Sequence, residues 1–329
     1  MEQHIVATKG ERQWQGIPSI ERAGNGRLWC AFFSGGPREP HVDNEILITS
    51  STDKGATWSA PAAIISPAGT TRAYDPCLWH DPTGRLWLFY NLASRNEGFF
   101  TLWAMTATNS EEADPIWSAP RLVPVDAPFA FRLNKPIVLR NGDWLLPVTH
   151  APAAPDDWFA RDRQLQGVAL SPDQGETWTL YGGVAAPAWA LENMLVERPD
   201  GSIWMLIRTG AGVLWQSFSY DGGRTWDDGT PTTITNPGSR FFVRRLTSGR
   251  ILLINTPHAS QRRTLWAYLI HLDEQMALRG GLELDARDKV SYPDAVEAPD
   301  GVLYAVHDCD RYGAGEIVLS RFAESEIGG

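Results

Sequence analysis

The sequence predicts an all-β fold, and specifically a six-bladed β-propeller, from three observations. A short glycine turn followed by an apolar run recurs six times, a second turn motif interleaves with it, and no long amphipathic helical pattern is present. Fifteen tryptophans in 329 residues are also more typical of a β-fold than of a helical bundle. Repeats of about 50 residues with several short strands each are typical of propellers. We therefore expect one domain that spans residues 1–329.

The first motif is a glycine turn between β-prone runs. Its copies read GNGRLW, PTGRLW, RNGDW, PDGSIW, TSGRIL and PDGVLY. The turn glycines, which number the repeats one to six below, are Gly26, Gly84, Gly142, Gly201, Gly249 and Gly301. Their spacings are 58, 58, 59, 48 and 52 residues. Glycine supplies the positive φ that a tight turn needs, so each copy predicts a hairpin.

The second motif reads S-x-D-x-G-x-T-W. It occurs at residues 51–58, 171–178 and 219–226, with a decayed copy at 110–117. In such a segment the aspartate accepts backbone N–H groups, the glycine permits the bend, and the tryptophan packs beneath the turn. We interpret this motif as a folding device and not as a binding site.

Composition and charge exclude several functions. A net charge of −10 and a pI near 5.2 argue against a nucleic-acid partner, which would need a basic face. Three cysteines have neither metal-ligand nor disulfide-framework spacing. The apolar runs are too short to span a bilayer, and the first residues lack a signal-peptide pattern. We expect a cytoplasmic protein with no membrane partner, no metal and no cofactor; the oligomeric state is not predicted.

Position within the repeat indicates a candidate site. In each repeat one strand runs to the glycine turn and the next strand returns from it, so their far ends lie at the same rim of the sheet. If these are the inner strands of each blade, their far ends surround one mouth of the central channel. The polar residues nine positions before the turn glycines are Asp75, Glu192, Arg240 and Tyr292. Arg208 and Asp308 lie seven positions after the turn glycines of their repeats. Polar residues at strand ends can simply cap the strands. A set that contains carboxylates, arginines and a phenol is larger than capping requires, so we interpret it as a candidate site.

The repeats and this ring resemble the sialidase (neuraminidase) family, and the resemblance covers nearly the whole chain. The segment from Glu192 to Arg208 is similar to the one that supplies the family's glutamate and second arginine. Arg262, with Arg263 as the alternative, lies in a segment similar to that of the third arginine. The residues SYPD resemble the nucleophile segment and make Tyr292 the implied nucleophile. The resemblance implies that Glu192 activates Tyr292, and that the arginines hold a substrate carboxylate.

A tyrosine nucleophile suits an anionic substrate. Such a substrate repels a carboxylate, whereas a neutral phenol can approach it, and sialidases are exceptions among glycosidases in this respect. The phenol, with an ordinary pKa near 10, needs a base to activate it. A separate acid must protonate the leaving oxygen. The resemblance places that acid in residues 35–44, where Asp43 is the first candidate, with Glu45 just beyond as the second.

One departure from the family concerns the first arginine. The family begins with Arg-Ile-Pro, whereas this chain has Gly16-Ile17-Pro18. Arginine binds a carboxylate bidentately, so its loss changes the pocket. The basic residues that we considered as replacements are Arg240, Lys135, Arg72 and Arg132. Together with Asp75 and Asp308 on the rim, Lys135 also fits a rebuilt pocket for a different sugar, in which His150 is a candidate general base.

These observations lead to one hypothesis and two alternatives. The hypothesis is an exo-acting glycoside hydrolase that removes a terminal, acidic, sialic-acid-like sugar from a small carbohydrate substrate. The first alternative is a hydrolase or lyase of the same fold that acts on a uronic-acid-type or neutral sugar. The second is a propeller that binds glycans without catalysis.

Overall fold

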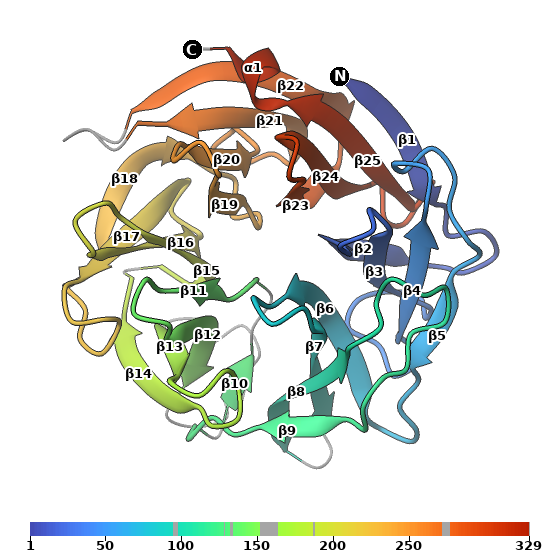
Figure 1. Cartoon of the computed structure of the whole chain (residues 1–329), viewed down its shortest axis with the longest axis horizontal. Helices are drawn as coiled ribbons and strands as arrows, with labels where there is room; N and C mark the ends of the chain where they lie inside the picture. The colour runs from blue at the N-terminus through green and yellow to red at the C-terminus, as the bar shows by residue number, and fades with distance from the viewer. Residues whose placement is uncertain are drawn as a thin grey trace.

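The computed structural model describes residues 1–94, 98–127, 129–131, 134–151, 164–186, 188–271 and 277–328. The described chain is all-β apart from a short helix near the C-terminus, which confirms the expected fold class. The sheets are arranged in a ring around a central axis (Figure 1). The one described helix, α1 (Glu324–Ile327), has four residues, so no helix in this part of the chain could cross a membrane.

Four of the sheets have four strands each. In the first, the order is β2 (Gln15–Arg22), β3 (Leu28–Ser34), β4 (Glu45–Ser51) and β5 (Ala62–Ile65). The next contains β15 (Ala190–Glu197), β16 (Ile203–Thr209), β17 (Val213–Ser219) and β18 (Thr230–Thr235). The third contains β19 (Phe242–Arg245), β20 (Ile251–Asn255), β21 (Arg263–Ile270) and β22 (Leu278–Asp288). The last contains β1 (Glu2–Ala7), β25 (Glu316–Ala323), β24 (Val302–Cys309) and β23 (Val290–Glu297).

The fifth sheet is larger and contains two repeats. Its strands are β6 (Arg72–His80), β7 (Leu86–Ser94), β8 (Phe99–Ala107), β9 (Arg121–Val123), β10 (Phe129–Phe131), β11 (Ile137–Val138), β12 (Trp144–Ala151), β13 (Leu165–Ser171) and β14 (Thr179–Val184). β10 pairs in parallel with β8 and antiparallel with β12, and so connects repeats two and three. The described strands therefore form five sheets, one fewer than the six separate blades expected from the repeats.

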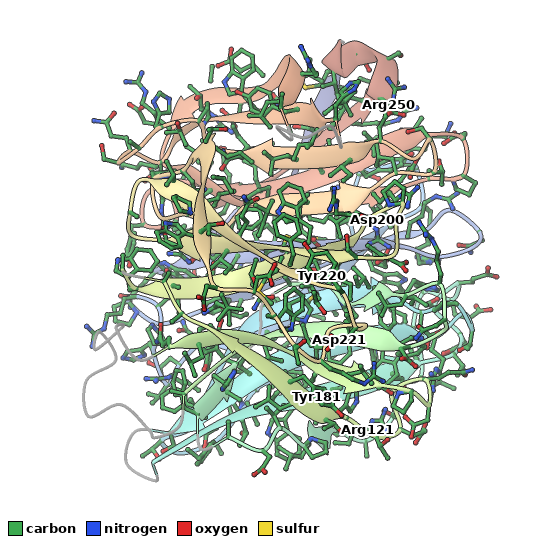
Figure 2. The ribbon with its side chains drawn as sticks, turned by 90° about the vertical axis from the view of Figure 1, so that its left-hand side faces the viewer. Arg121, Tyr181, Asp200, Tyr220, Asp221 and Arg250 are labelled. Atoms are coloured by element: carbon green, nitrogen blue, oxygen red, sulfur yellow. The ribbon has the colours of Figure 1, made fainter. Side chains whose placement is uncertain are left out.

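The six repeat turns adopt one geometry. In each of them the glycine N–H donates to the carbonyl of the residue three positions earlier, as Gly26 does to Ala23 at 3.0 Å and Gly201 to Arg198 at 3.0 Å. All six glycines have φ between 80° and 96°. Each turn joins two paired strands, as the repeats predict. Asp200 and Arg250, from two of these turns, lie in the right-hand half of the side view (Figure 2).

The second motif closes turns through its own side chains. In the first copy, Thr57 donates to Asp53 through both its backbone N–H, at 2.9 Å, and its hydroxyl, at 2.6 Å. The indole of Trp58 donates to the carbonyl of Gly55 at 3.0 Å. The copies at 171–178 and 219–226 repeat these bonds. The polar groups of the motif are thus used within the turn, as expected for a folding device.

The terminal strands join the ends of the chain. β1 pairs antiparallel with β25, from Glu2 opposite Arg321 to Ala7 opposite Ile317. The two termini accordingly lie close together in Figure 1. This pairing brings repeat six beside repeat one, and segments from opposite ends of the sequence become neighbours there.

A buried ionic network connects several repeats. The ammonium of Lys135 lies 3.1 Å from Glu21 and 3.3 Å from Asp294. Asp294 also accepts from Ser19 at 2.6 Å and lies 3.7 Å from the guanidinium of Arg240. All five residues are buried. Buried charges are tolerated when they are paired in this way.

Candidate active site

Four residues with left-handed backbone mark equivalent positions in four repeats. They lie nine positions before the turn glycines and are Ile17 (φ 58°), Asp75 (φ 53°), Glu192 (φ 57°) and Tyr292 (φ 55°). At each of them the first strand has one residue more than the partner strand it faces, which is a β-bulge. A non-glycine residue at positive φ costs about 1–3 kcal/mol, and such strain clusters at functional sites.

These four residues line one cavity. It has a volume of about 370 Å³, within the range of small-molecule sites, roughly 300–1,000 Å³. One part of its wall is charged or phenolic, and the rest is apolar apart from Gln164. The lining residues are Ile17, Phe33, Glu39, Pro40, Tyr74, Asp75, Phe131, Gln164, Leu191, Glu192, Arg208, Arg262, Tyr292 and Tyr312.

Glu192, Arg208 and Tyr292 form a hydrogen-bonded group in this cavity. Nη1 of Arg208, on β16, donates to Oε1 of Glu192 at 2.5 Å and to the Tyr292 hydroxyl oxygen at 2.8 Å. The Tyr292 hydroxyl in turn donates to the same Glu192 oxygen at 3.4 Å. The second Glu192 oxygen, Oε2, is buried and has no hydrogen-bond partner among the described residues. The structure thus brings together three residues that the repeat positions selected.

The surroundings favour the neutral form of the Tyr292 phenol. Burial raises the pKa of the Tyr292 phenol, and the Glu192 carboxylate adds to this effect. Arg208, Arg262 and Arg311 lower the same pKa, but burial outweighs them. For Arg208, burial lowers the pKa, yet Glu192 and Tyr292 raise it above its ordinary value, so this residue stays charged. A neutral phenol beside a carboxylate is an arrangement in which the carboxylate can take the phenolic proton and so activate the oxygen as a nucleophile.

Arg311 is a residue of this site that the sequence analysis missed. Its guanidinium carbon lies 4.2 Å from the centre of the Tyr292 ring, compared with 5.3 Å for Arg262 and 5.6 Å for Arg208. Arg311 lies three residues after Asp308, in the turn that follows β24. Continuing the count beyond seven positions after Gly301 would have reached it.

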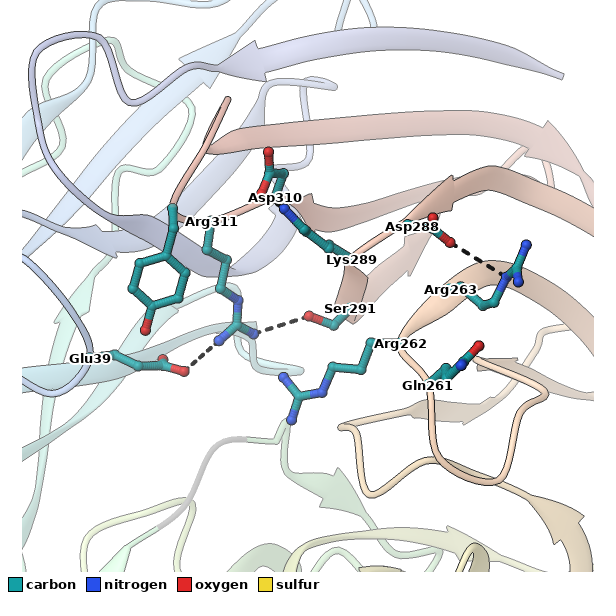
Figure 3. A pocket seen from close by; sticks show the side chains of 10 residues that line it. Glu39, Gln261, Arg262, Arg263, Asp288, Lys289, Ser291, Asp310 and Arg311 are labelled. Carbon is teal, nitrogen blue, oxygen red and sulfur yellow. Dashed lines mark hydrogen bonds and ion pairs between the residues drawn. The ribbon is translucent and has the colours of Figure 1, made fainter.

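Arg311 is buried and uses three of its nitrogens. Nε donates to Asp308 at 2.8 Å, Nη1 to Glu39 at 2.5 Å, and Nη2 to Ser291 at 3.2 Å. The pair with Glu39 crosses the junction between repeats six and one and is drawn in Figure 3. A Cβ atom added to Gly16 would lie 2.9 Å from Cδ of Arg311. The glycine that precedes Ile17 therefore gives Arg311 the space it occupies.

The carboxyl that reaches the cavity from residues 35–44 is Glu39. Its side chain is 28% exposed and faces the cavity, with Arg311 as its partner. Burial raises the pKa of the Glu39 carboxyl, and the opposing effect of Arg311 does not cancel it. Asp43 instead has a side chain that is 70% exposed, lies 3.3 Å from His41 and is not among the cavity-lining residues. Glu45, at the start of β4, does not line the cavity either.

The other candidate residues are in different places. Asp75 lines the cavity, whereas Asp308 lies behind it, where it accepts from Arg311, Ser291 and the Ile17 backbone N–H. Lys135 and Arg240 belong to the buried ionic network, although the Arg240 guanidinium carbon is 6.0 Å from the Tyr292 ring centre.

Among the remaining basic residues, Arg262 lines the cavity and donates to the Gly238 carbonyl at 3.3 Å. Arg263, the alternative to it, pairs with Asp288 on the outer side. Arg72 is buried against Phe100, and Arg132 lies outside the described residues. Burial lowers the pKa of His150, whose ring nitrogen is 3.2 Å from the Gly182 carbonyl.

No group of three or more metal-ligating side chains occurs among the described residues. Residues 26–305 match the BNR repeat-like domain, and the chain belongs to this family.

The chain is similar to three further proteins in sequence or in structure. The anhydrosialidase of Macrobdella decora is 30% identical over 121 residues, which are 32% of this chain and only 15% of the relative. Hadza microbial sialidase Hz136 superposes with a TM-score of 0.80 at 18% identity, over 98% of this chain and 68% of its own. The intramolecular trans-sialidase from Ruminococcus gnavus, solved with oseltamivir carboxylate, gives 0.74 at 17% identity, over 98% and 97%. At these identities the structural likeness shows the fold.

Proposed function

We propose that the chain is an exo-acting glycoside hydrolase that removes one terminal acidic sugar by double displacement. The observation that carries this proposal is the contact of one guanidinium, that of Arg208, with both Glu192 and Tyr292 inside a cavity. Nucleophile and base are held in hydrogen-bond reach of each other by this contact.

In the first step, the Tyr292 oxygen attacks the anomeric carbon while Glu192 takes the phenolic proton. The glycosidic bond breaks, and Glu39, the carboxyl whose pKa burial raises, acts in its protonated form and gives its proton to the leaving oxygen. In the second step, the Glu39 carboxylate takes a proton from water, whose oxygen attacks the anomeric carbon. The bond to Tyr292 breaks, and Glu192 returns its proton to the phenol. Two displacements retain the anomeric configuration.

Arg262 and Arg208 are the cations that would receive the substrate carboxylate. Both line the cavity, and Arg262 makes only one hydrogen bond to the described protein, to the Gly238 carbonyl. Charge-assisted bonds from guanidinium groups suit a carboxylate. Asp75, across the same cavity, is placed to accept a hydroxyl of the sugar. We also propose that each of the six hairpins belongs to its own propeller blade, with repeats two and three joined edge to edge through β10.

A second candidate function rests on Ile17. It places an apolar side chain on the cavity wall next to Gly16, which stands where the family has its first arginine, and Arg311 is already bonded to three partners. A pocket with fewer available cations also fits a uronic-acid-type or neutral sugar. Binding of glycans without catalysis is the remaining alternative.

The test is trapping of the covalent intermediate. Wild-type protein is incubated with a 3-fluorinated sialyl fluoride and digested, and the peptide masses are measured; we expect one added glycosyl group on Tyr292. Tyr292→Phe should show no adduct and no release of fluorescent product from an aryl α-sialoside, while Tyr220→Phe, which alters an exposed tyrosine on a distant turn, behaves as wild type. An adduct on another residue would overturn the nucleophile assignment. Turnover only of uronides would favour the second candidate, and glycan binding without product would favour the third.

A further inference from the structure

The backbone of Glu192 is held by side chains of the preceding repeat. Its N–H donates to the Thr149 hydroxyl at 3.0 Å, and its carbonyl accepts from the Asn134 amide at 2.8 Å. The same Asn134 nitrogen donates to the carbonyl of Asn193 at 2.9 Å. Asn134 and Thr149 are both 1% exposed and belong to repeat three, whereas Glu192 belongs to repeat four. The bulge that carries Glu192 is therefore bonded across the junction between two repeats.

The Thr149 hydroxyl is oriented for this contact. It donates to Oε1 of Gln166, its neighbour on β13, at 3.0 Å, so its lone pairs remain for the N–H of Glu192. The buried Gln166 amide in turn donates through Nε2 to the Ala190 carbonyl at 2.8 Å, and this bond fixes which of its atoms faces Thr149. A valine in place of Thr149 would keep the shape of the side chain but would make neither bond.

We propose that Thr149 and Asn134 are positioning residues for Glu192. The inference rests on the proposed function, because that function makes Glu192 the base. Glu192 has a φ of 57°, and a non-glycine residue keeps such a backbone only where its surroundings hold it there. A bulge re-aims a side chain, and this one directs the carboxylate to the Tyr292 hydroxyl, 3.4 Å away. The two bonds from repeat three fix the peptide groups on either side of the Glu192 Cα, and so fix the direction of its side chain.

The same type of contact occurs where the ring closes. Asp308 lies seven positions after its turn glycine, as Thr149 does, and its Oδ2 accepts the N–H of Ile17 at 2.8 Å. Ile17 lies nine positions before its own turn glycine, as Glu192 does, and it also lies in a bulge. Repeat five has a threonine at the position of Thr149 as well, Thr256, but its hydroxyl has no hydrogen-bond partner among the described residues. Thr256 is therefore the matched control for Thr149.

The experiment measures the first displacement alone. Each variant is mixed with 3-fluorinated sialyl fluoride, and mass spectrometry follows the adduct on Tyr292 with time, which gives a maximal rate constant and a half-saturating concentration. We expect Thr149→Val to reduce the rate constant about tenfold or more at a similar half-saturating concentration, because a misplacement of about 1 Å can cost about 100-fold. Thr149→Ser, which keeps the hydroxyl, should restore most of the rate constant, and Thr256→Val should behave as wild type.

A double-mutant cycle shows whether the effect passes through Glu192. In Glu192→Gln the carboxylate base is absent, so adding Thr149→Val should cause little further loss of the rate constant. A general disturbance of the cavity would instead slow both backgrounds by the same factor. Asn134→Leu removes the other bond to the Glu192 backbone and should give the same pattern in the two backgrounds.

The outcomes separate this inference from the function on which it rests. An unchanged rate constant in Thr149→Val, or an equal loss in the wild-type and Glu192→Gln backgrounds, would overturn the positioning role while the glycosidase assignment stands. A Thr149→Ser variant as slow as Thr149→Val would overturn it too, because the hydroxyl would then not be the group that matters. Absence of any adduct on the folded wild-type protein would refute the proposed sialidase-type function, and this inference with it.

Discussion

The guanidinium carbon of Arg311 lies 4.2 Å from the ring centre of Tyr292, while one of its nitrogens donates to Glu39 at 2.5 Å. One cation therefore contacts both the proposed nucleophile and the proposed acid. It reaches them from repeat six, and not from repeat one, where the resemblance places an arginine. A cation over a tyrosine face stabilises the phenolate, and a cation beside a carboxyl favours its ionised form.

Replacing this cation should alter the pH dependence of the reaction. In Arg311→Gln the pKa of Glu39 should rise further, because the effect that lowers it is removed. The basic limb of the profile of kcat/KM against pH should then move to higher pH, and kcat should fall on the order of 100-fold, as for loss of a charge-assisted contact at a reacting group. Arg250→Gln, which changes a half-exposed arginine on a distant turn, is the control. An unmoved profile would show that Arg311 only supports the structure.

Gly16 tests whether the space for Arg311 is required. The backbone of Gly16 has no positive φ, so alanine is acceptable for the main chain, but its Cβ would lie 2.9 Å from Cδ of Arg311 and 3.0 Å from Asp308. We expect Gly16→Ala to reduce kcat/KM about tenfold or more, with a modest loss of stability, about 1–3 kcal/mol for overpacking. Gly183→Ala is the matched control, because its Cβ would meet only Leu165, at 3.6 Å. Equal activities of the two variants would contradict the prediction.

The raised pKa of Glu39 should be visible in the stability of the protein. The folded protein keeps the Glu39 proton at pH values where an unfolded chain, with an ordinary glutamate pKa near 4.3, has lost it. The contribution of this group to the free energy of unfolding is thus greatest below that value and falls as the pH rises through the folded pKa. Glu39→Gln should remove this slope, as measured by urea unfolding between pH 4 and 7.

The same variant also tests the role of Glu39 as an acid. Glu39→Gln should reduce kcat/KM for 3′-sialyllactose by roughly 10²–10⁴-fold, the usual contribution of general acid catalysis. The loss for α-sialyl fluoride should be smaller, because fluoride leaves without protonation. Asp43→Asn, in the exposed part of the same loop, should affect neither substrate. The reverse pattern would return the acid role to Asp43.

The buried network should be important for stability. Lys135→Met leaves Glu21 and Asp294 without their ammonium partner, and breaking a buried ion pair in this way costs about 3–5 kcal/mol. Lys289→Met removes the same side-chain type from an exposed pair with Asp310, which should cost at most about 1 kcal/mol. The free energies of unfolding in urea give the comparison. Similar losses in both variants would show that the network contributes little.

The sequence predicts which residues lie at the rim of the ring, but it does not distinguish residues that line the cavity from residues buried below it. Counting nine residues before a turn glycine identified Glu192 and Tyr292, because equivalent strands of a repeat fold place equivalent residues alike. Lys135 lies two residues further along, seven before its turn glycine, as Ser19 and Asp294 do. All three are in the buried network, one layer below the cavity. Spacing alone does not separate these layers.

The residues that the sequence analysis missed come from loops. Arg311 and Glu39 are 272 positions apart, and neither belongs to the strand positions that the repeats define. Their contact depends on the pairing of β1 with β25 and on the space beside Gly16, which no local pattern reports. For the same reason the sequence could narrow the acid only to a short acidic segment. Which of its carboxyls faces the cavity depends on the path of the loop.

The pairing of the first and last strands also determines when the site is complete. A chain is synthesised from its N-terminus, so Tyr292, Arg311 and β25 leave the ribosome well after Glu39. A nascent chain that lacks them has an open ring, lacks the proposed nucleophile and leaves the Glu39 carboxyl without its partner Arg311. The proposed site therefore assembles only after repeat six has been made, and a truncated product without that repeat would lack the site and expose two sheet edges.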